Sequence, residues 1–220
     1  MAIHCDDLNL LYLCTAKTGS TSVSSALIDQ LGGRWVPRDH IWDGDRILVD
    51  FKHSSLQDLV DVDLFDRAEF ESMHVALTVR NPFAWVLSDY RYRQRVVREA
   101  QDLGAATPNW IRSRQDLVER AADVSFDEFV RNELTGRTDS MFGRYVEGFR
   151  DLPSLTYLKI ESIDADFNAL LSGLGVGWHL SFPHDNATSG PGYRSVYSDE
   201  GRALVEAAFA DDLAMFDYRF

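Results

Sequence analysis

A run of small and hydroxylated residues, TAKTGSTS at positions 15–22, follows directly on an apolar run at positions 8–14. The pattern predicts a strand, a tight loop and the start of a helix. In such a turn, backbone N–H groups and the helix N-terminus converge on one point beyond the sheet edge, where phosphate or sulfate can bind. Lys17 adds a positive charge, and no acidic residue lies between Asp7 and Asp29. The segment therefore predicts an anion-binding loop; the plainer interpretation is a hydroxylated helix cap.

The order of residues in this loop differs from that of the ATP-binding loop GxxxxGK[ST], in which the lysine comes late, just before a magnesium-binding hydroxyl. Here Lys17 precedes Gly19 and most of the hydroxyl run. The strand predicted at positions 75–79 ends at Arg80, where a magnesium site would place an acid. Both usual protein ligands of a magnesium-dependent phosphoryl-transfer site are therefore missing. The sequence predicts anion transfer without a metal.

Two motifs resemble those of sulfotransferases that use PAPS (3'-phosphoadenosine 5'-phosphosulfate). TAKTGSTS resembles their 5'-phosphosulfate-binding loop, PKTGSTS, with Ala16 where the family usually has proline. RNPFAWVLSDY, at positions 80–90, resembles their 3'-phosphate-binding motif RNPxxxxxSxY. The resemblance implies that Arg80 and Ser88 hold the 3'-phosphate. The residues that it implies for the phosphosulfate end are Lys17, Thr18, Gly19, Ser20, Thr21 and Ser22.

The resemblance extends over nearly the whole chain. LTYLKIES, at positions 155–162, resembles a family strand that ends in a glutamate, and the tail from position 185 resembles the family's closing asparagine, YR and FxYxF elements. Tyr193 and Arg194 follow the sequence GPG, in a loop that could close over the nucleotide. They are therefore further nucleotide-binding candidates, of which Arg194 is the weaker phosphate ligand.

The transfer that the resemblance implies needs a cation for the leaving phosphate and a base for the acceptor hydroxyl. Lys17 is the implied cation. His53 is the preferred base, because it follows an apolar run at positions 47–51 and resembles the family's KH element. His40 and Glu161 stay open as alternatives, with a structural or acceptor-binding role favoured for Glu161. Lys52 could tune His53 or bind an anionic acceptor, or simply be solvated.

The elements that must position these residues alternate between strands and helices. Strands are predicted at positions 8–14, 47–51, 75–79 and 155–160, and helices over 82–103, 109–122 and 126–134, after the loop at 15–22, around 167–174 and from 198 onward. The alternation predicts an α/β fold, a three-layer sandwich with a central parallel sheet and a P-loop-like phosphosulfate-binding loop. We expect one domain over residues 1–220.

Composition narrows the function classes. The 220 residues are 45% hydrophobic and 26% charged, which is the balance of a globular protein, and the net charge of −13 argues against nucleic acid as a partner. Two cysteines and the lack of a signal sequence or membrane span predict a cytoplasmic protein. Five arginines lie between positions 80 and 98 against one aspartate. Some of these, from Arg91 to Arg98, form either a solvated helix face or an acceptor-binding strip.

The sequence thus predicts a sulfotransferase that moves the sulfuryl group from PAPS to a hydroxyl acceptor, a carbohydrate or another small molecule. The alternatives are a P-loop kinase using ATP and an inactive nucleotide-binding module. The acceptor and the oligomeric state stay open. Aromatic residues that could line an acceptor pocket, or belong to the core, are Trp42, Trp85, Tyr92 and Trp110.

Overall fold

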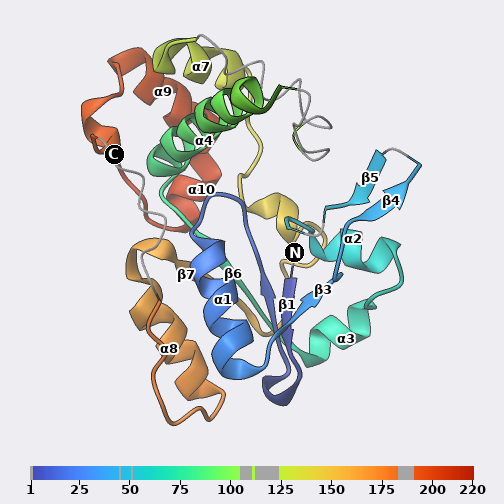
Figure 1. The fold of residues 1–220 in the computed structure, drawn as a ribbon. Helices are drawn as coiled ribbons and strands as arrows, with labels where there is room; N and C mark the ends of the chain where they lie inside the picture. Colours follow the sequence, from blue (N-terminus) through green and yellow to red (C-terminus); the bar gives the residue numbers. More distant parts are fainter. Residues whose placement is uncertain (1, 45, 51, 105–110, 112–123, 183–190) are drawn as a thin grey trace. The chain divides into compact units, whose positions relative to one another are not determined.

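The computed structural model describes residues 2–44, 46–50, 52–104, 111, 124–182 and 191–220. Its contacts divide the chain into two compact units (Figure 1). The first comprises Met1–Arg80 and Phe142–Ala187, and the second comprises Asn81–Met141 and Thr188–Phe220. The helix predicted at 109–122, including Trp110, lies almost entirely outside the described residues.

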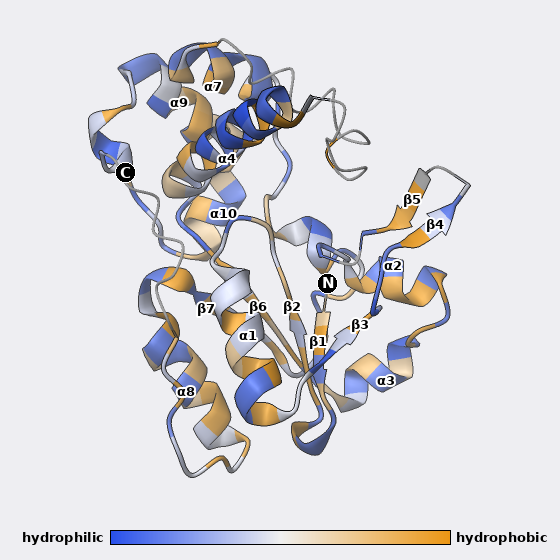
Figure 2. Ribbon diagram, in the orientation of Figure 1, coloured by the Kyte–Doolittle hydropathy of each residue, from blue (hydrophilic) through white to orange (hydrophobic). Residues whose placement is uncertain are grey.

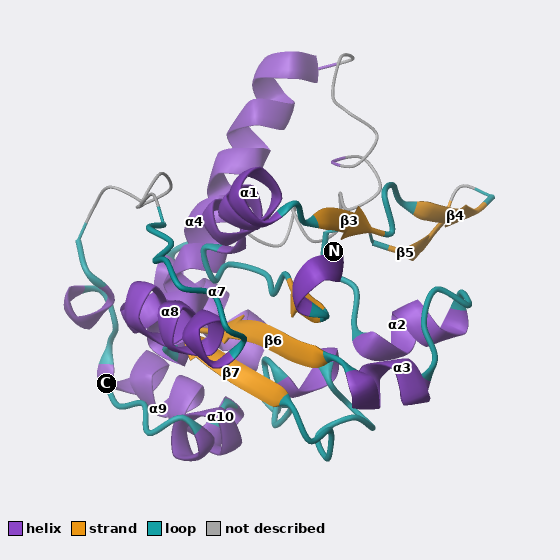
Figure 3. Ribbon diagram, turned by 90° about the horizontal axis from the view of Figure 1, so that it is seen from below, coloured by secondary structure: helices purple, strands orange, loops and turns teal. Residues whose placement is uncertain are grey.

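The first unit is built on a five-stranded sheet with the strand order β3-β1-β2-β6-β7. The bounds are β1 Ala2–Cys5, β2 Leu10–Leu13, β3 Arg34–Val36, β6 His74–Val79 and β7 Leu155–Lys159. β2, β6 and β7 run parallel, as predicted, and Figure 3 shows β6 and β7 side by side. β1 runs antiparallel to both of its neighbours. The predicted parallel arrangement is therefore confirmed for β2, β6 and β7, after which the predicted site residues follow. The strands β1 and β3 were not predicted.

The strand predicted at 47–51 exists, but it does not belong to the central parallel sheet as we expected. β5 (Arg46–Val49) pairs antiparallel with β4 (Ile41–Asp43) in a separate two-stranded sheet, with a register shift between Ile41 and Trp42. Val49 is buried, whereas Leu48 is 51% exposed. An apolar run of this length does not specify which sheet it joins, because a short buried strand and a hairpin strand carry the same residue types.

Helices cover both faces of the central sheet, so the three-layer prediction is confirmed for this unit. Along β2, Leu10 and Tyr12 face one core and Leu11 and Leu13 the other, as strand alternation requires. The first core is covered by α1 (Ser20–Leu31) and α8 (Ile163–Gly173), each of which contains both hydrophobic and hydrophilic residues (Figure 2). The second is covered by α2 (Leu56–Asp61) and α3 (Arg67–Ser72).

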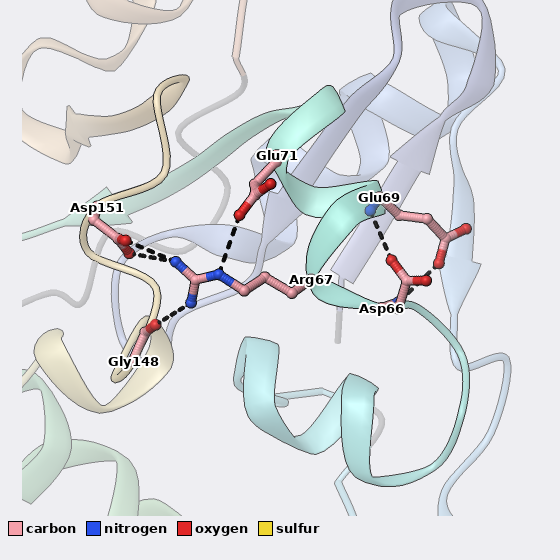
Figure 4. A network of polar contacts seen from close by, with 6 residues as sticks. All are labelled: Asp66, Arg67, Glu69, Glu71, Gly148 and Asp151. Carbon is pink, nitrogen blue, oxygen red and sulfur yellow. Dashed lines mark hydrogen bonds and ion pairs between the residues drawn. The ribbon is translucent and has the colours of Figure 1, made fainter.

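A polar network fastens α3 to the segment before β7 (Figure 4). The Arg67 guanidinium donates to both carboxylate oxygens of Asp151, at 2.8 and 2.7 Å, to the Gly148 carbonyl oxygen at 2.7 Å, and to Glu71 at 3.1 Å. The bonds from Arg67 lower the pKa of Asp151. Asp66 begins α3 with a reciprocal capping box to Glu69. One arginine therefore ties two segments of the unit that are far apart in sequence.

The second unit is helical in its described residues. Its elements are α4 Pro82–Leu103, α7 Phe126–Leu134, the short η5 Tyr193–Ser195, α9 Asp199–Ala208 and α10 Ala210–Met215. α4 has the predicted bounds, with proline in its first turn and the Asn81 side chain accepting a bond from Phe83 N–H. Ser125 caps α7 and Ser198 caps α9, also as predicted. The C-terminal run is two helices that meet at Phe209.

Burial of His4 is expected to make the stability of the protein depend on pH. His4, in β1, is 7% exposed; its Nδ1 lies 2.7 Å from Asp6 Oδ1, and its Nε2 has no hydrogen-bond partner among the described residues. Burial lowers the pKa of His4 below its usual 6.5, against the opposing pull of Asp6. The unfolded chain therefore takes up the proton more readily. Stability from a neutral His4 is fully present above about pH 6.5 and is lost as the pH falls below it.

We expect the free energy of unfolding, measured by urea denaturation, to fall between pH 8 and pH 5.5. In His4→Asn this fall should be smaller, because that side chain does not titrate. An equal fall in both proteins would contradict the assignment to His4.

Candidate active site

The loop between β2 and α1 has a backbone shape that few residue types allow. Lys17 has φ = 62° and Gly19 has φ = 70°, both in the left-handed region. A Cβ atom at Gly19 would lie 2.7 Å from Cδ1 of Ile160, in the short helix η4 (Ile160–Ser162) that follows β7. Only glycine fits there without movement of Ile160. The predicted glycine thus serves both the turn and the close packing against η4.

The first turn of α1 is arranged for an anion. Gly19 occupies the N-cap, no side chain caps the helix, and the first turn contains no acid. Ser20 and Ser22 are half-buried and Thr21 is exposed. The helix N-terminus therefore presents N–H groups and hydroxyls with no built-in negative group to neutralise its dipole.

Thr18 differs from the other predicted hydroxyl donors. It is fully buried, and its hydroxyl donates to the Thr15 carbonyl oxygen at 2.9 Å. The Thr15 hydroxyl in turn donates to the carbonyl oxygen of Thr78, in β6. The single Thr18 proton is thus used inside the loop. In this conformation the Thr18 hydroxyl braces the loop from within, and the role of Thr18 toward a nucleotide stays a prediction.

Arg80 supports the loop from the carboxyl end of β6. Its Nη1 donates to the Lys17 carbonyl oxygen at 2.9 Å. Since β2 and β6 are parallel neighbours, their carboxyl ends meet at one edge of the sheet. Two of the predicted nucleotide ligands, Lys17 and Arg80, are therefore brought together.

His53 is held at the start of the same loop. Its Nδ1 lies 3.0 Å from the Cys14 carbonyl oxygen. A carbonyl can only accept, so Nδ1 carries the proton and the lone pair of the neutral ring lies on Nε2. Burial raises the pKa of the neighbouring Cys14 thiol to about 11, so that side chain stays protonated and is not a competing nucleophile. While this bond is kept, a neutral His53 can take up a proton only at Nε2.

The turn that carries His53 is organised by Asp50. The Asp50 carbonyl oxygen accepts from His53 N–H at 3.2 Å and from the Ser54 hydroxyl at 2.7 Å. Its carboxylate accepts from Lys52 N–H at 2.8 Å and lies 3.5 Å from His40 Nδ1. His40 thus faces the carboxylate of this turn, whereas His53 contacts the loop. Glu161, in η4, is exposed.

Two residues at this site escaped the sequence analysis. The Tyr145 hydroxyl, in the short helix η3 (Gly143–Tyr145), accepts from Ala16 N–H at 3.1 Å and from Arg144 Nη2 at 2.9 Å. The Arg144 guanidinium also lies 4.7 Å from the Tyr145 ring centroid. Neither residue falls within a recognisable motif, because they approach the loop from a part of the chain more than 120 residues away.

The remaining predicted ligands belong to the second unit. Ser88 is buried on α4. Tyr193 stacks on Phe83, with ring centroids 6.1 Å apart, and its hydroxyl lies 3.4 Å from Asn81 Nδ2. Arg194 is exposed, with its guanidinium 4.8 Å from the Tyr193 ring centroid. Within this unit, contacts of Tyr193 therefore hold η5 against the start of α4.

The arginines of α4 are mostly engaged within the second unit. Arg93 pairs with Asp89 at 2.7 Å and with Glu133 at 3.2 Å, and Arg95 lies 3.5 Å from Glu99. Arg91 donates to the Pro191 carbonyl oxygen at 2.7 Å and Arg98 to that of Gln94 at 3.1 Å. Arg93, with a side chain only 15% exposed, is therefore paired inside the unit, whereas Arg95, at 60%, fits the solvated helix face.

Searches for a membrane-spanning helix, for a metal site and for similar proteins bear on the function of this chain. In the part of the chain that the structure describes, no helix is long and apolar enough to cross a membrane, and no group of three or more His, Cys, Asp or Glu residues could hold a metal ion. No curated protein and no solved structure matches the chain. A family model described as "Sulfotransferase family" matches residues 1–219. With its parallel site-bearing strands and its strand–loop–helix at residues 10–31, this chain belongs to the sulfotransferase family.

Proposed function

We propose that the protein transfers the sulfuryl group of PAPS to a hydroxyl group of a carbohydrate or other small-molecule acceptor. The observation that carries the proposal is the bond from His53 Nδ1 to the Cys14 carbonyl oxygen. It holds a candidate base at the end of the strand that opens into the anion loop. The family match over 1–219 spans both units, which we take to act as one sulfotransferase domain.

The donor nucleotide is bound, in this proposal, at its two charged ends. The phosphosulfate lies at the α1 N-terminus, against Lys17, Thr18, Ser20, Thr21 and Ser22, with Gly19 allowing the close approach. Arg80 and Ser88 bind the 3'-phosphate, by resemblance to the RNPxxxxxSxY motif. Tyr193 is a further nucleotide contact and Arg194 a weaker one. The site uses no metal.

The transfer is an in-line displacement at sulfur. The acceptor hydroxyl loses its proton to His53 Nε2 as its oxygen bonds to sulfur, and the bond from sulfur to the bridging oxygen of the 5'-phosphate breaks. The electron pair of that bond stays on adenosine 3',5'-bisphosphate (PAP). Lys17 neutralises the charge that builds on this leaving group. The products are the sulfated acceptor, PAP and a protonated His53.

Incubation of the purified protein with ³⁵S-labelled PAPS and a panel of hydroxylated acceptors tests the proposal. We expect label in one acceptor class, with PAP released in equal amount. PAP should also raise the melting temperature of the protein. Stabilisation by MgATP with none by PAP would instead favour a kinase, and PAP binding without transfer to any acceptor would favour an inactive binding module.

Replacement of Arg80 by alanine is predicted to weaken PAP binding by about 10- to 100-fold, the equivalent of a lost charged hydrogen bond of about 1.5 to 3 kcal/mol. Calorimetric titration with PAP and with AMP, which lacks the 3'-phosphate, separates two roles of this side chain. A loss confined to PAP supports contact with the 3'-phosphate. An equal loss for both nucleotides would mean that Arg80 acts only through its bond to the Lys17 carbonyl oxygen.

A further inference from the structure

The β2–α1 loop is held at its entry from two directions. The Cys14 carbonyl oxygen accepts from His53, and, two residues later, Ala16 N–H donates to the Tyr145 hydroxyl. Tyr145 is 2% exposed, and its ring packs in the core that also contains Leu11 and Leu13 of β2. Its hydroxyl is thus carried by a ring that is held in a buried hydrophobic core.

Position 16 is where the loop departs from the sequence PKTGSTS. A proline there would have no N–H group, whereas Ala16 brings a donor into a half-buried loop entry. A donor that is removed from water and left without an acceptor is costly. The Tyr145 hydroxyl supplies an acceptor for this donor.

We propose that Tyr145 is a positioning residue for the donor-binding loop, and that it acts through the N–H group of Ala16. Arg144 supports it, because the guanidinium donates to the Tyr145 hydroxyl and lies over its ring. Ala16 immediately precedes Lys17, whose left-handed φ of 62° directs its side chain. The anchoring of one backbone amide thereby fixes the place from which Lys17 acts. The expected effects on PAP affinity and on kcat rest on the proposed function.

A double-mutant cycle between Tyr145 and position 16 tests the coupling. Tyr145→Phe keeps the buried ring and removes the acceptor, so we expect the Kd for PAP to rise about tenfold and kcat to fall. Ala16→Pro removes the donor. In that background the same Tyr145→Phe change should alter the Kd by less than about twofold, because the Ala16 N–H group is absent and the exposed Arg144 can donate to water instead. An equal penalty in both backgrounds would overturn the coupling.

A second measurement applies even if Ala16→Pro does not fold or the protein proves to have another substrate. Hydrogen–deuterium exchange at the Ala16 amide should accelerate about tenfold in Tyr145→Phe. The matched control is Tyr12→Phe, which removes another buried hydroxyl of the same unit, bonded to Thr78 Oγ1 at 2.6 Å. Exchange at Ala16 should stay unchanged in this control.

The outcomes separate the two proposals. Unchanged exchange in Tyr145→Phe, or equal acceleration in Tyr12→Phe, would overturn the positioning role, whatever the substrate. A wild-type protein that neither binds PAP nor transfers sulfate would instead overturn the proposed function, while the exchange result would still decide the role of Tyr145.

Discussion

Lys17→Ala is expected to lower kcat for sulfuryl transfer by at least about 100-fold, the effect of removing one group that stabilises charge in a transition state. The physical reason is that Lys17 is the cation of the loop, at the N-terminus of a helix without an acid in its first turn. The bond that breaks places its electrons on the 5'-phosphate, where this charge is needed. Steady-state rates with labelled PAPS at saturating acceptor provide the measurement.

Because Lys17 has a left-handed backbone conformation, a second variant is needed to separate the loss of charge from a change in loop geometry. A residue with a Cβ atom, lysine or alanine, is strained at φ = 62°, whereas glycine adopts this conformation readily. Lys17→Ala therefore removes the charge and keeps the backbone strain, Lys17→Gly removes both, and the two variants should be equally inactive. Recovery of the rate in Lys17→Gly would show that loop geometry, and not the ammonium group, explains the loss. Lys17→Arg should recover part of the rate, because it keeps the charge.

His53→Asn is predicted to lower kcat by about 10²- to 10⁴-fold, the usual contribution of a general base. The asparagine amide nitrogen can replace Nδ1 as donor to the Cys14 carbonyl oxygen, so the loop keeps its contact while Nε2 is lost. PAP affinity, measured by calorimetry, should change little. A variant that binds PAP and does not transfer sulfate is thus the expected result.

The two other candidate bases provide the controls. His40→Asn should keep most of its rate, because the His40 ring lies against the Asp50 carboxylate. Glu161→Gln should do so because Glu161 is an exposed side chain of η4. Full activity in His53→Asn, together with a large loss in one of these two, would move the base to that residue.

The anion loop and α4 could be predicted from the sequence because each carries local signals. The bounds of α4 follow from Asn81 as cap, Pro82 in the first turn and Gly104 at the end. The loop is specified by Gly19 and by the hydroxyl run between an apolar strand and a helix. Signals of this kind act within a few residues of where they stand, so a single sequence displays them.

The missed elements depend on contacts that the sequence does not display. β1 and β3 span four and three residues, and neither is followed by the loop and helix signals that mark the equally short β2. Thr18 carries the residue type of an anion ligand, and only the fold reveals that its proton is used by Thr15. Tyr145 reaches Ala16 across 129 positions of sequence. In each case a partner supplied by the tertiary structure decides the role of the residue.

The antiparallel strand β1 has a consequence for the order of folding. Its pairing with β2 and β3 involves only residues 2–36, whereas β2 reaches β6 through the distant pair Leu10 and His74. Short loops close with a smaller loss of chain entropy than long ones. During synthesis, β1, β2, α1 and β3 can therefore assemble early, with the anion loop already bounded by strand and helix. Thr78 and Arg80 reach the loop only when β6 joins the sheet.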